Sequence, residues 1–384
     1  MKRKKILISL LLLICLSSFI YSTGTKESSK DSVESKEGLQ DSNGDNPSWL
    51  VSNTDEAITV IDNGGNQVTI KKPVNKIISL GMGELYSCLR AIDADDKIVS
   101  STWYTYTNPS FYPNFSKLPL VSDSQQGIDT EEIVELDPDV IFIKNNFYGN
   151  LNDTIKNEYP VVEIPFDTLD DIDMFATILG KEKEAKEYIA WINKYLNEID
   201  EKISNLPQDD FKKVFMFYGG EYGMSAPPPY GTFGKDNERT NMISRAGGKS
   251  ISANLPGDWI TVDPEWLIEQ DPNSIVREYY ITDDTPIMGY SVNDKPKAKE
   301  VLERIIGQAA IADTQAVKTN NVSMIYGDIF EDSWFIGISY LAKYFHPDLF
   351  EDLNPIQIQQ EYITRFQGLK YDLNKQGVFF EKLN

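Results

Sequence analysis

Aromatic residues are concentrated in segments that follow runs typical of β-strands. Such segments begin after Leu80, Ser101 and Lys144 in the first half of the chain, and after Tyr218, Arg277 and Gly327 in the second half. Ligands of open α/β sheets bind outside the carboxyl ends of the strands, so these segments are where a binding site would form. Exposed aromatic side chains at the ends of two sheets predict a cleft that holds a large, partly apolar ligand. The candidate aromatic contacts are Trp103, Tyr104, Tyr106, Phe147, Tyr148, Tyr222, Tyr230, Tyr279, Tyr280, Phe330 and Trp334.

Four basic residues could add charged contacts to such a cleft, namely Arg277, Arg239, Arg245 and Lys144. Arg277 has the best placement, because it stands at the end of an expected strand. Arg239 and Arg245 also fit an ordinary role as surface charges. We therefore expect Arg277 to be the main charged contact of the cleft.

The composition disfavours one class of function. The formal net charge is −22, whereas a protein that binds nucleic acid needs a basic face. The hydrophobic content of 41% and aromatic content of 11% indicate a globular fold. We expect no nucleic-acid partner, and we interpret the acidity as a solvated surface.

The amino-terminal sequence predicts export. The basic run "MKRKK" precedes an apolar run too short for a spanning helix, which is the pattern of a signal peptide, here residues 1–22. Residues 23–55 are rich in Ser, Lys, Glu and Asp, and we expect them to form a disordered linker. Thr23 stands where the cysteine of a lipid-attachment motif would be expected. A soluble exported protein is therefore favoured, and a lipid anchor to the outer face of a membrane stays open.

The remaining chain predicts an α/β fold with two lobes. Strand and helix patterns alternate, which is typical of a mainly parallel sheet flanked by helices. A long amphipathic pattern with Ala185, Ile192 and Ile203 on one face interrupts this alternation. We expect an N-terminal lobe at 56–170, one long rigid linking helix at 171–206 and a C-terminal lobe at 207–384.

A short internal repeat connects the two expected lobes. "EEIVELDPDVIF" at 131–142 matches "EWLIEQDPNSIV" at 265–276, so that Glu131 aligns with Glu265 and Asp137 with Asp271. Each copy predicts a helix, an Asp-Pro turn and a strand. Both glutamates fall in the first turn of their helix, where the helix dipole alone would favour them.

The order of these elements resembles the substrate-binding proteins of iron–siderophore and vitamin B12 ABC transporters. The resemblance rests on the hairpin "ITVIDNGGNQVTI" leading into "KIISLG", on the repeat, and on "AVKTNNVSMI" and "SYLAKYFHPDLF". It covers about Ile58 to Phe366 and implies two lobes joined by a rigid helix, with a small-molecule ligand between them. It also implies an ABC permease as partner, with one docking glutamate on each lobe. These positions fall on Glu131 and Glu265, although Glu132 could replace Glu131, and the pair would suit a two-fold symmetric partner.

The ligand implied by the resemblance is a metal chelate, and we expect a ferric siderophore. Sites for bare zinc or manganese use several histidines, whereas this chain contains one, His346, which we interpret as a capping or packing residue. Ferric siderophores are often anionic, which would suit arginine. Haem stays open because Tyr218, Tyr222, Met224 and Tyr230 lie in the segment where some relatives ligate haem iron. Cobalamin is the third alternative, and no resident cofactor is expected.

A different class of function is an exported hydrolase with a pair of catalytic carboxylates. Asp283-Asp284 and Glu331-Asp332 are possible pairs, because a glycosidase needs two such groups. The sequence contains no convincing nucleophile, phosphate or zinc-protease motif. We therefore expect a carrier and not an enzyme, while an adhesin or chelatase-like protein of the same fold stays open.

Overall fold

The computed structural model describes residues 47–124, 127–144, 149, 151–218, 230–280, 286–293 and 296–383. The expected signal peptide and the candidate contacts Phe147, Tyr148, Tyr222 and Met224 lie outside these residues. Along the described residues, no helix is both long enough and apolar enough to cross a membrane.

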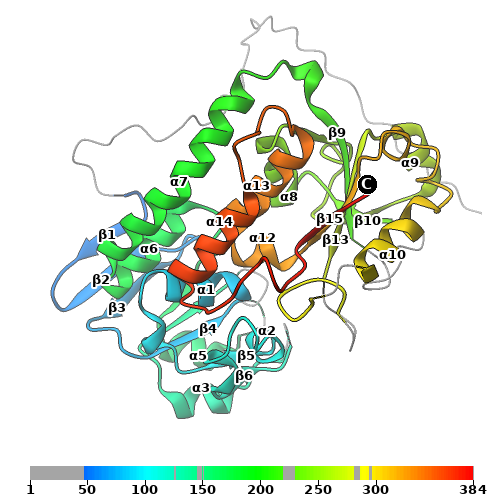
Figure 1. Ribbon diagram of the computed structural model, residues 1–384. Helices are drawn as coiled ribbons and strands as arrows, with labels where there is room; N and C mark the ends of the chain where they lie inside the picture. Colours follow the sequence, from blue (N-terminus) through cyan, green and yellow to red (C-terminus); the bar gives the residue numbers. More distant parts are fainter. Residues whose placement is uncertain are drawn as a thin grey trace, which may run out of the picture. The chain divides into compact units, whose positions relative to one another are not determined.

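The described chain begins with a small antiparallel sheet of β1 (Leu50–Asn53), β2 (Ala57–Ile61) and β3 (Gln67–Lys71) (Figure 1). The predicted hairpin is confirmed, because β2 pairs with β3 from Ile61↔Gln67 onward. The expected end of the linker at residue 55 is wrong. Trp49 is buried and β1 pairs with β2, so this stretch gains apolar and backbone contacts that its polar composition did not indicate.

The N-terminal lobe contains a parallel sheet in the order β4-β7-β8, formed by Ile77–Leu80, Val140–Ile143 and Val161–Glu163. A second parallel pair joins β5 (Ser101–Thr102) to β6 (Leu120–Ser122). Buried, mostly aliphatic residues lie on both faces of β4 and β7, as expected for a parallel sheet covered by helices. The helices of the lobe are α1 (Gly83–Ala91), α2 (Trp103–Thr107), α3 (Thr130–Leu136) and α5 (Asp153–Glu158), with short 3-10 helices at Asp95–Lys97 and Phe115–Lys117.

Two helices follow this lobe where the sequence predicts one. α6 (Leu169–Leu179) ends at Gly180, which adopts a left-handed conformation with φ 69°. α7 then runs from Glu182 to Ser204. The expected start of the linking helix is therefore wrong, because the glycine terminates the first helix. Ala185, Ile192 and Ile203 are buried on α7 as predicted.

The C-terminal lobe contains a seven-stranded mixed sheet in the order β12-β10-β9-β13-β14-β15, with β11 paired to β9. β9, β11, β13 and β14 run parallel, whereas β10, β12 and β15 are antiparallel to their neighbours. The strands span Lys212–Tyr218 (β9), Tyr230–Phe233 (β10), Gly248–Ser250 (β11), Trp259–Val262 (β12), Ser274–Tyr279 (β13), Val322–Tyr326 (β14) and Phe380–Lys382 (β15). The helices are α8 (Glu238–Arg245), α9 (Pro264–Gln270), α10 (Pro296–Ile306), α11 (Gln315–Lys318), α12 (Asp328–Asp332), α13 (Trp334–Phe345) and α14 (Pro355–Glu361), and α14 continues into a π-helix at Tyr362–Phe366.

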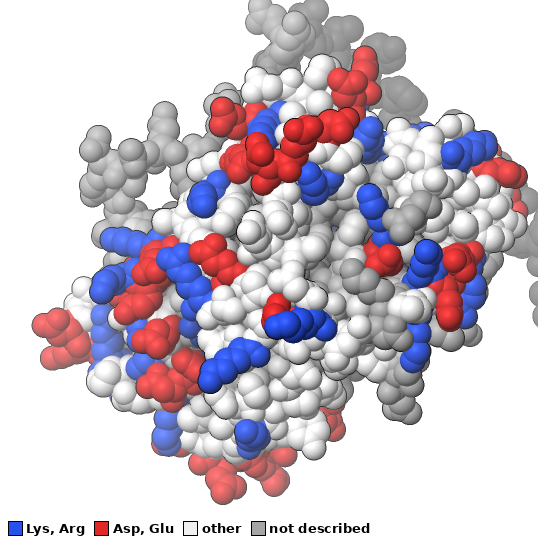
Figure 2. Space-filling model, viewed as in Figure 1, with Lys and Arg blue, Asp and Glu red and all other residues white. Residues whose placement is uncertain are grey.

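The internal repeat is confirmed as a helix, an Asp-Pro turn and a strand in each lobe. α3 leads into β7 through Asp137 with φ 46°, and α9 leads into β13 through Asp271 with φ 42°. Aspartate tolerates this left-handed conformation better than most residues. Figure 2 shows acidic side chains at the lower end of the view, where α3 lies.

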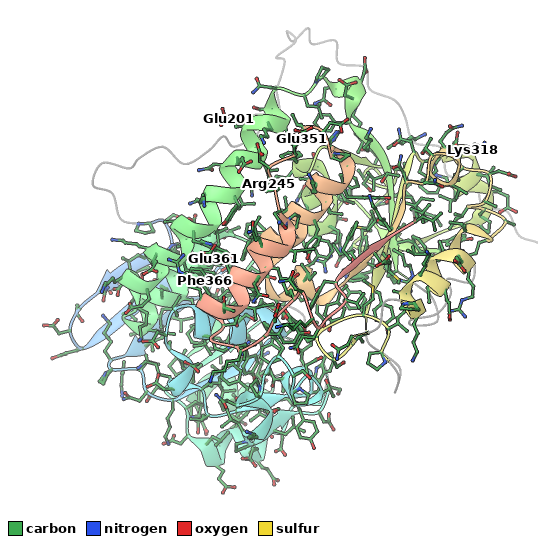
Figure 3. All side chains as sticks on the ribbon, in the orientation of Figure 1. Glu201, Arg245, Lys318, Glu351, Glu361 and Phe366 are labelled. Atoms are coloured by element: carbon green, nitrogen blue, oxygen red, sulfur yellow. The ribbon has the colours of Figure 1, made fainter. Side chains whose placement is uncertain are left out.

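The C-terminal segment forms a second connection to the N-terminal lobe. Phe366 of the π-helix packs on Tyr188 and Trp191 of α7, with ring centroids 4.9 Å and 4.8 Å apart (Figure 3). Beyond the π-helix, Gln367 Nε2 donates a hydrogen bond to the Ser87 carbonyl oxygen of α1 at 3.0 Å. The two lobes are thus linked by α7 and, through packing, by the end of the chain.

Candidate functional site

Charged residues meet where the carboxyl ends of the strands of both lobes face each other. In the N-terminal lobe, Glu84 lies in the first turn of α1 after β4, and Lys144 follows β7. In the C-terminal lobe, Glu278 lies near the end of β13, and Glu331 lies on α12 after β14. This is the position at which α/β sheets bind ligands.

Lys144 connects the two lobes. Its Nζ lies 3.1 Å from Glu84 Oε1 and 3.6 Å from Glu331 Oε2. Burial opposes the ammonium charge, but Glu84 and Glu331 outweigh this effect and raise the pKa of Lys144. The lysine is therefore charged at neutral pH and neutralised by a carboxylate from each lobe.

Arg239 continues the charged network in the C-terminal lobe. It is only 1% exposed, and its Nη2 lies 2.6 Å from Glu331 Oε1 and 3.0 Å from Glu278 Oε1. Its guanidinium also lies over the ring of Phe330, 4.8 Å from the centroid. Burial would raise the pKa of Glu331, but Arg239 and Lys144 lower it. Glu331 is therefore an ionised carboxylate held between two cations.

A second cluster joins the lobes through Asp332 of α12. Its Oδ1 accepts hydrogen bonds from Tyr112 at 2.7 Å and from Tyr104 at 3.2 Å, both of the N-terminal lobe. Burial, together with the charge of Asp328, raises the pKa of Asp332 well above its usual range. Burial also raises the pKa of Asp328, whose carboxylate accepts a bond from Tyr326, to about 7.

Gly83 allows α1 to approach α12 closely. A Cβ atom at this position would lie 1.5 Å from Asp332 Oδ1 and 2.4 Å from the Tyr112 hydroxyl. No L-residue with a side chain fits such a contact without movement. The glycine is therefore required by the contact between the lobes.

The candidate contacts predicted from the sequence divide into two groups. Tyr104, Tyr280 and Phe330 belong to the site; the Tyr280 hydroxyl accepts a hydrogen bond from Arg239 at 3.2 Å. Trp103 lies beside Tyr104 with ring centroids 5.7 Å apart, and the half-buried Trp334 begins α13 next to α12.

The other candidates lie elsewhere. Tyr106 is 58% exposed. Tyr230 packs on Phe215 and Phe217 in the core of its own lobe, and the buried Tyr279 hydroxyl accepts a hydrogen bond from the Ile287 backbone N–H at 3.2 Å.

The structure gives the basic residues surroundings that differ from those expected. Arg277 is 2% exposed, lies over the ring of Phe217 and donates to the carbonyl oxygen of Glu278, so it belongs to the sheet core. Arg239, which the sequence also allowed as a surface charge, is the central cation of the site. Arg245 is a surface charge paired with Asp200 beside α7, 2.6 Å away (Figure 3).

Sequence reasoning missed several residues of the site, although their segments were noted. Glu84 lies in "GMGELY" after β4, and Asp328 lies in "DIFEDSW" after β14. Glu278 follows Arg277 directly. Tyr112 ends the aromatic segment "TWYTYTNPSFY" that follows Ser101, although it was not among the candidate contacts.

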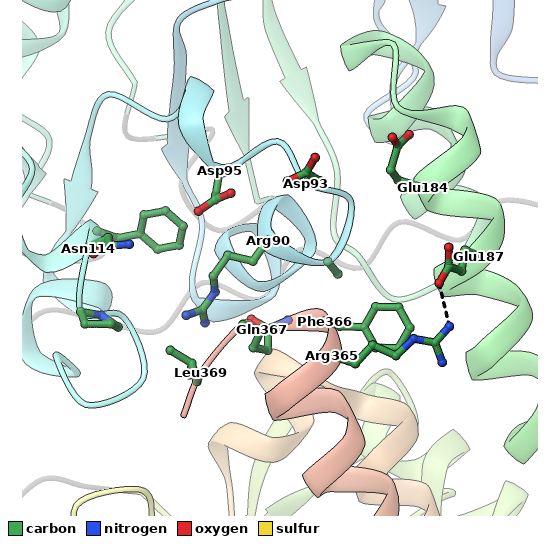
Figure 4. A pocket seen from close by; sticks show the side chains of 14 residues that line it. Arg90, Asp93, Asp95, Asn114, Glu184, Glu187, Arg365, Phe366, Gln367 and Leu369 are labelled. Atoms are coloured by element: carbon green, nitrogen blue, oxygen red, sulfur yellow. Dashed lines mark hydrogen bonds and ion pairs between the residues drawn. The ribbon is translucent and has the colours of Figure 1, made fainter. Parts of the chain in front are cut away.

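A separate cavity of about 500 Å³ lies at the opposite end of α1 (Figure 4). Arg90, Glu187, Arg365 and Gln367 are among its lining residues. Arg365 Nη2 pairs with Glu187 Oε1 at 2.7 Å across this cavity, and the Arg90 guanidinium lies 4.6 Å from the Phe111 ring centroid. Arg365 thus has its ion-pair partner in the cavity wall, whereas Phe111 is not one of the lining residues.

The two repeated helices carry matching exposed residues. Glu131 and Glu265 are exposed in the first turns of α3 and α9. One turn later, Val134 is 47% exposed and Ile268 is 54% exposed. Each lobe therefore presents a carboxylate next to an exposed aliphatic side chain at the same position of the repeat.

Comparison with known proteins places these features in a family context. The sequence profile of the periplasmic binding protein family matches residues 85–327. The uncharacterized ABC transporter substrate-binding lipoprotein YvrC of Bacillus subtilis strain 168 is 25% identical over 308 residues, which cover 77% of this chain and 87% of YvrC. The iron(3+)-hydroxamate-binding protein YxeB of the same organism is 28% identical over 215 residues, or 55% of this chain and 58% of YxeB.

A solved structure supports the fold. The crystal structure of the TroA-like periplasmic binding protein FepB from Veillonella parvula is similar with a TM-score of 0.69 at 20% sequence identity. The similarity covers 85% of this chain and 99% of that chain. The α/β lobes described above are therefore shared with a binding protein of known structure.

Proposed function

Because the chain belongs to the periplasmic binding protein family, we propose that it captures a metal chelate between its lobes, a ferric siderophore in particular, and delivers it to an ABC permease. Members of this family are binding proteins that act outside the cytoplasm, and they are not enzymes. The alternative of an exported hydrolase is therefore wrong. Glu331 and Asp332 were one of the carboxylate pairs that suggested a hydrolase. Glu331 forms ion pairs with Arg239 and Lys144, and Asp332 accepts hydrogen bonds from two tyrosine hydroxyls.

The ion pairs of Lys144 carry the proposal. Lys144 joins Glu84 of its own lobe to Glu331 of the other lobe at 3.1 Å and 3.6 Å. Side chains of both lobes thus converge at the ends of their strands, which is where a carrier has to enclose its ligand. Tyr104, Tyr280 and Phe330 add aromatic surface to the same place.

The histidine content supports a chelate as ligand. The sequence contains one histidine. His346 is largely buried at the end of α13, and its Nε2 lies 2.9 Å from the Gly247 carbonyl oxygen. It therefore has a structural partner, in agreement with a capping or packing role. A metal ion that arrives already chelated needs aromatic walls and polar groups in place of an imidazole cluster.

Delivery to the permease is proposed to use the exposed carboxylates Glu131 and Glu265. The internal repeat gives each lobe one such residue in the same local structure, which suits a partner with two-fold symmetry. Glu132 is half-buried, so Glu131 is the better exposed of the two neighbours. Val134 and Ile268 would add apolar contacts at the same two places.

A fluorescence titration of the full exported chain tests the proposed ligand. Ferric trihydroxamate and tricatecholate chelates, haem and cobalamin are each added, and the emission of Trp103 and Trp334 beside the site is followed. We expect saturable, stoichiometric binding of a ferric siderophore. If only haem or only cobalamin binds, the ligand of this carrier is that compound and not a siderophore. If none of the compounds binds, the proposal of a chelate carrier is refuted.

A further inference from the structure

The charged network also carries information about the charge of the ligand. Among the described residues, the two cations Lys144 and Arg239 form ion pairs with the four carboxylates of Glu84, Glu238, Glu278 and Glu331. Asp328 and Asp332 lie next to this network on α12, and burial raises the pKa of both. Carboxylates thus outnumber cations even if these two aspartates are neutral.

Both cations are already engaged by protein groups. Arg239 donates to Glu278 through Nε at 3.1 Å and through Nη2 at 3.0 Å, while its Nη1 donates to Glu238 at 3.2 Å. Lys144 has a glutamate from each lobe. An anionic ligand would have to take one of these cations from its carboxylate and leave that carboxylate buried without compensation, which is unfavourable.

Glu84 has fewer partners than the other buried carboxylates of the network. The side chain is 7% exposed, and Lys144 Nζ lies 3.1 Å from its Oε1. No side chain of the described residues donates a hydrogen bond to its Oε2. Burial raises the pKa of Glu84, the nearby charge of Lys144 lowers it, and Glu331 raises it further. A donor group supplied by a ligand would satisfy this buried carboxylate.

We propose that this site selects a metal chelate of neutral or positive net charge whose ammonium or similar donor group binds Glu84. The inference rests on the proposed function and narrows its ligand class. Three singly charged hydroxamates cancel the charge of Fe(III), whereas three doubly charged catecholates leave a trianion. A trihydroxamate that carries a primary ammonium group meets the requirement, and a tricatecholate does not. This proposal takes the place of the expected anionic chelate held by arginine. Arg239 is paired with Glu278 and Glu331, and Arg277 lies in the core of the sheet.

The test compares three ferric chelates on the full exported chain. The first is a linear trihydroxamate with one primary ammonium group, the second is its neutral N-acetylated derivative, and the third is a tricatecholate. A hydrogen bond to a charged group contributes about 1.5 kcal/mol or more, which corresponds to about tenfold in Kd. We expect the ammonium chelate to bind about tenfold more tightly than the acetylated one, and the tricatecholate to bind more weakly than both.

Two variants with the same charge change locate the effect. Glu84→Gln should remove the preference for the ammonium chelate, so that the two hydroxamates bind this variant with equal affinity. Glu131→Gln, on the exposed first turn of α3, should keep the preference. Equal affinities of the two hydroxamates in the unmodified chain, a preference that survives in Glu84→Gln, or tighter binding of the tricatecholate would each overturn this inference while leaving the carrier function intact. Binding of none of the chelates would instead refute the proposed function, and this inference with it.

Discussion

Replacement of Gly83 by alanine should separate ligand affinity from folding stability. The new Cβ would lie 1.5 Å from Asp332 Oδ1, which belongs to the other lobe. Either the lobes move apart at this point or the carboxyl group of Asp332 leaves its place. In the second case it loses the hydrogen bonds from Tyr112 and Tyr104, at 2.7 Å and 3.2 Å.

The size of the effect follows from these two hydrogen bonds. Burial favours the neutral form of Asp332, so each bond contributes about 1 kcal/mol. Loss of both disfavours the closed arrangement by about 2 kcal/mol, which lowers its population relative to an open one by about 30-fold. A ligand enclosed by both lobes should bind more weakly by the same factor. Folding should be unaffected or slightly favoured, because alanine is a better helix residue than glycine by about 0.5–1 kcal/mol.

Gly81→Ala provides the matched control in the same loop. A Cβ at Gly81 would meet Leu85 Cβ at 3.6 Å, which is an ordinary contact. Affinity is measured by tryptophan fluorescence with the chelate that binds the unmodified chain, and stability by urea unfolding. Lobe separation is measured between spin labels on Glu131→Cys and Glu265→Cys; burial raises the pKa of the Cys88 thiol, so this residue should stay unlabelled. If Gly83→Ala matches Gly81→Ala in affinity and in distance distribution, the contact between α1 and α12 has no role in closure.

Three further predictions concern docking, fluorescence and pH. Alanine at both Glu131 and Glu265 should abolish uptake in transport assays and leave ligand affinity unchanged, because both carboxylates are exposed on α3 and α9. Loss of ligand affinity would place the two residues in the ligand site. The control protein carries alanine at Glu135 and Glu269, one turn later on the same helices. Ligand binding should quench the fluorescence of Trp103 or Trp334. If a Trp334→Phe protein shows the same quenching as the unmodified chain, Trp334 is not the residue that reports binding. Burial raises the pKa of Asp328 from 3.8 to about 7, so its stabilisation of the folded state is complete below pH 3.8 and is lost by about pH 7. The unfolding free energy of the unmodified chain should therefore fall across this range relative to Asp328→Asn, and parallel curves would contradict a buried protonated Asp328.

Local patterns in the sequence were sufficient for many, but not all, elements of the fold. The alternation of strands and helices, the hairpin around Asn63 and the two copies of the repeat depend on residues near one another in the chain. Their boundaries were missed where a single residue decides the outcome, as Gly180 does between α6 and α7. The expected linker ended too late, because the burial of Trp49 comes from packing against the folded lobe.

The composition of the site depended on contacts between distant residues. Tyr112 and Asp332 are 220 residues apart in sequence, and Arg239 meets Glu331 across 92 residues. No local pattern distinguishes Arg239 from Arg277, because both lie near the start or end of a regular element. Only the register of β13 against β9 turns Arg277 onto Phe217, and only the packing of α8 and α12 brings Arg239 between two glutamates. The sequence by itself therefore determined the α/β class and the elements with a clear local pattern. Tertiary structure decided which charges face each other, because the energy of an ion pair depends on distance and burial and not on position in the chain.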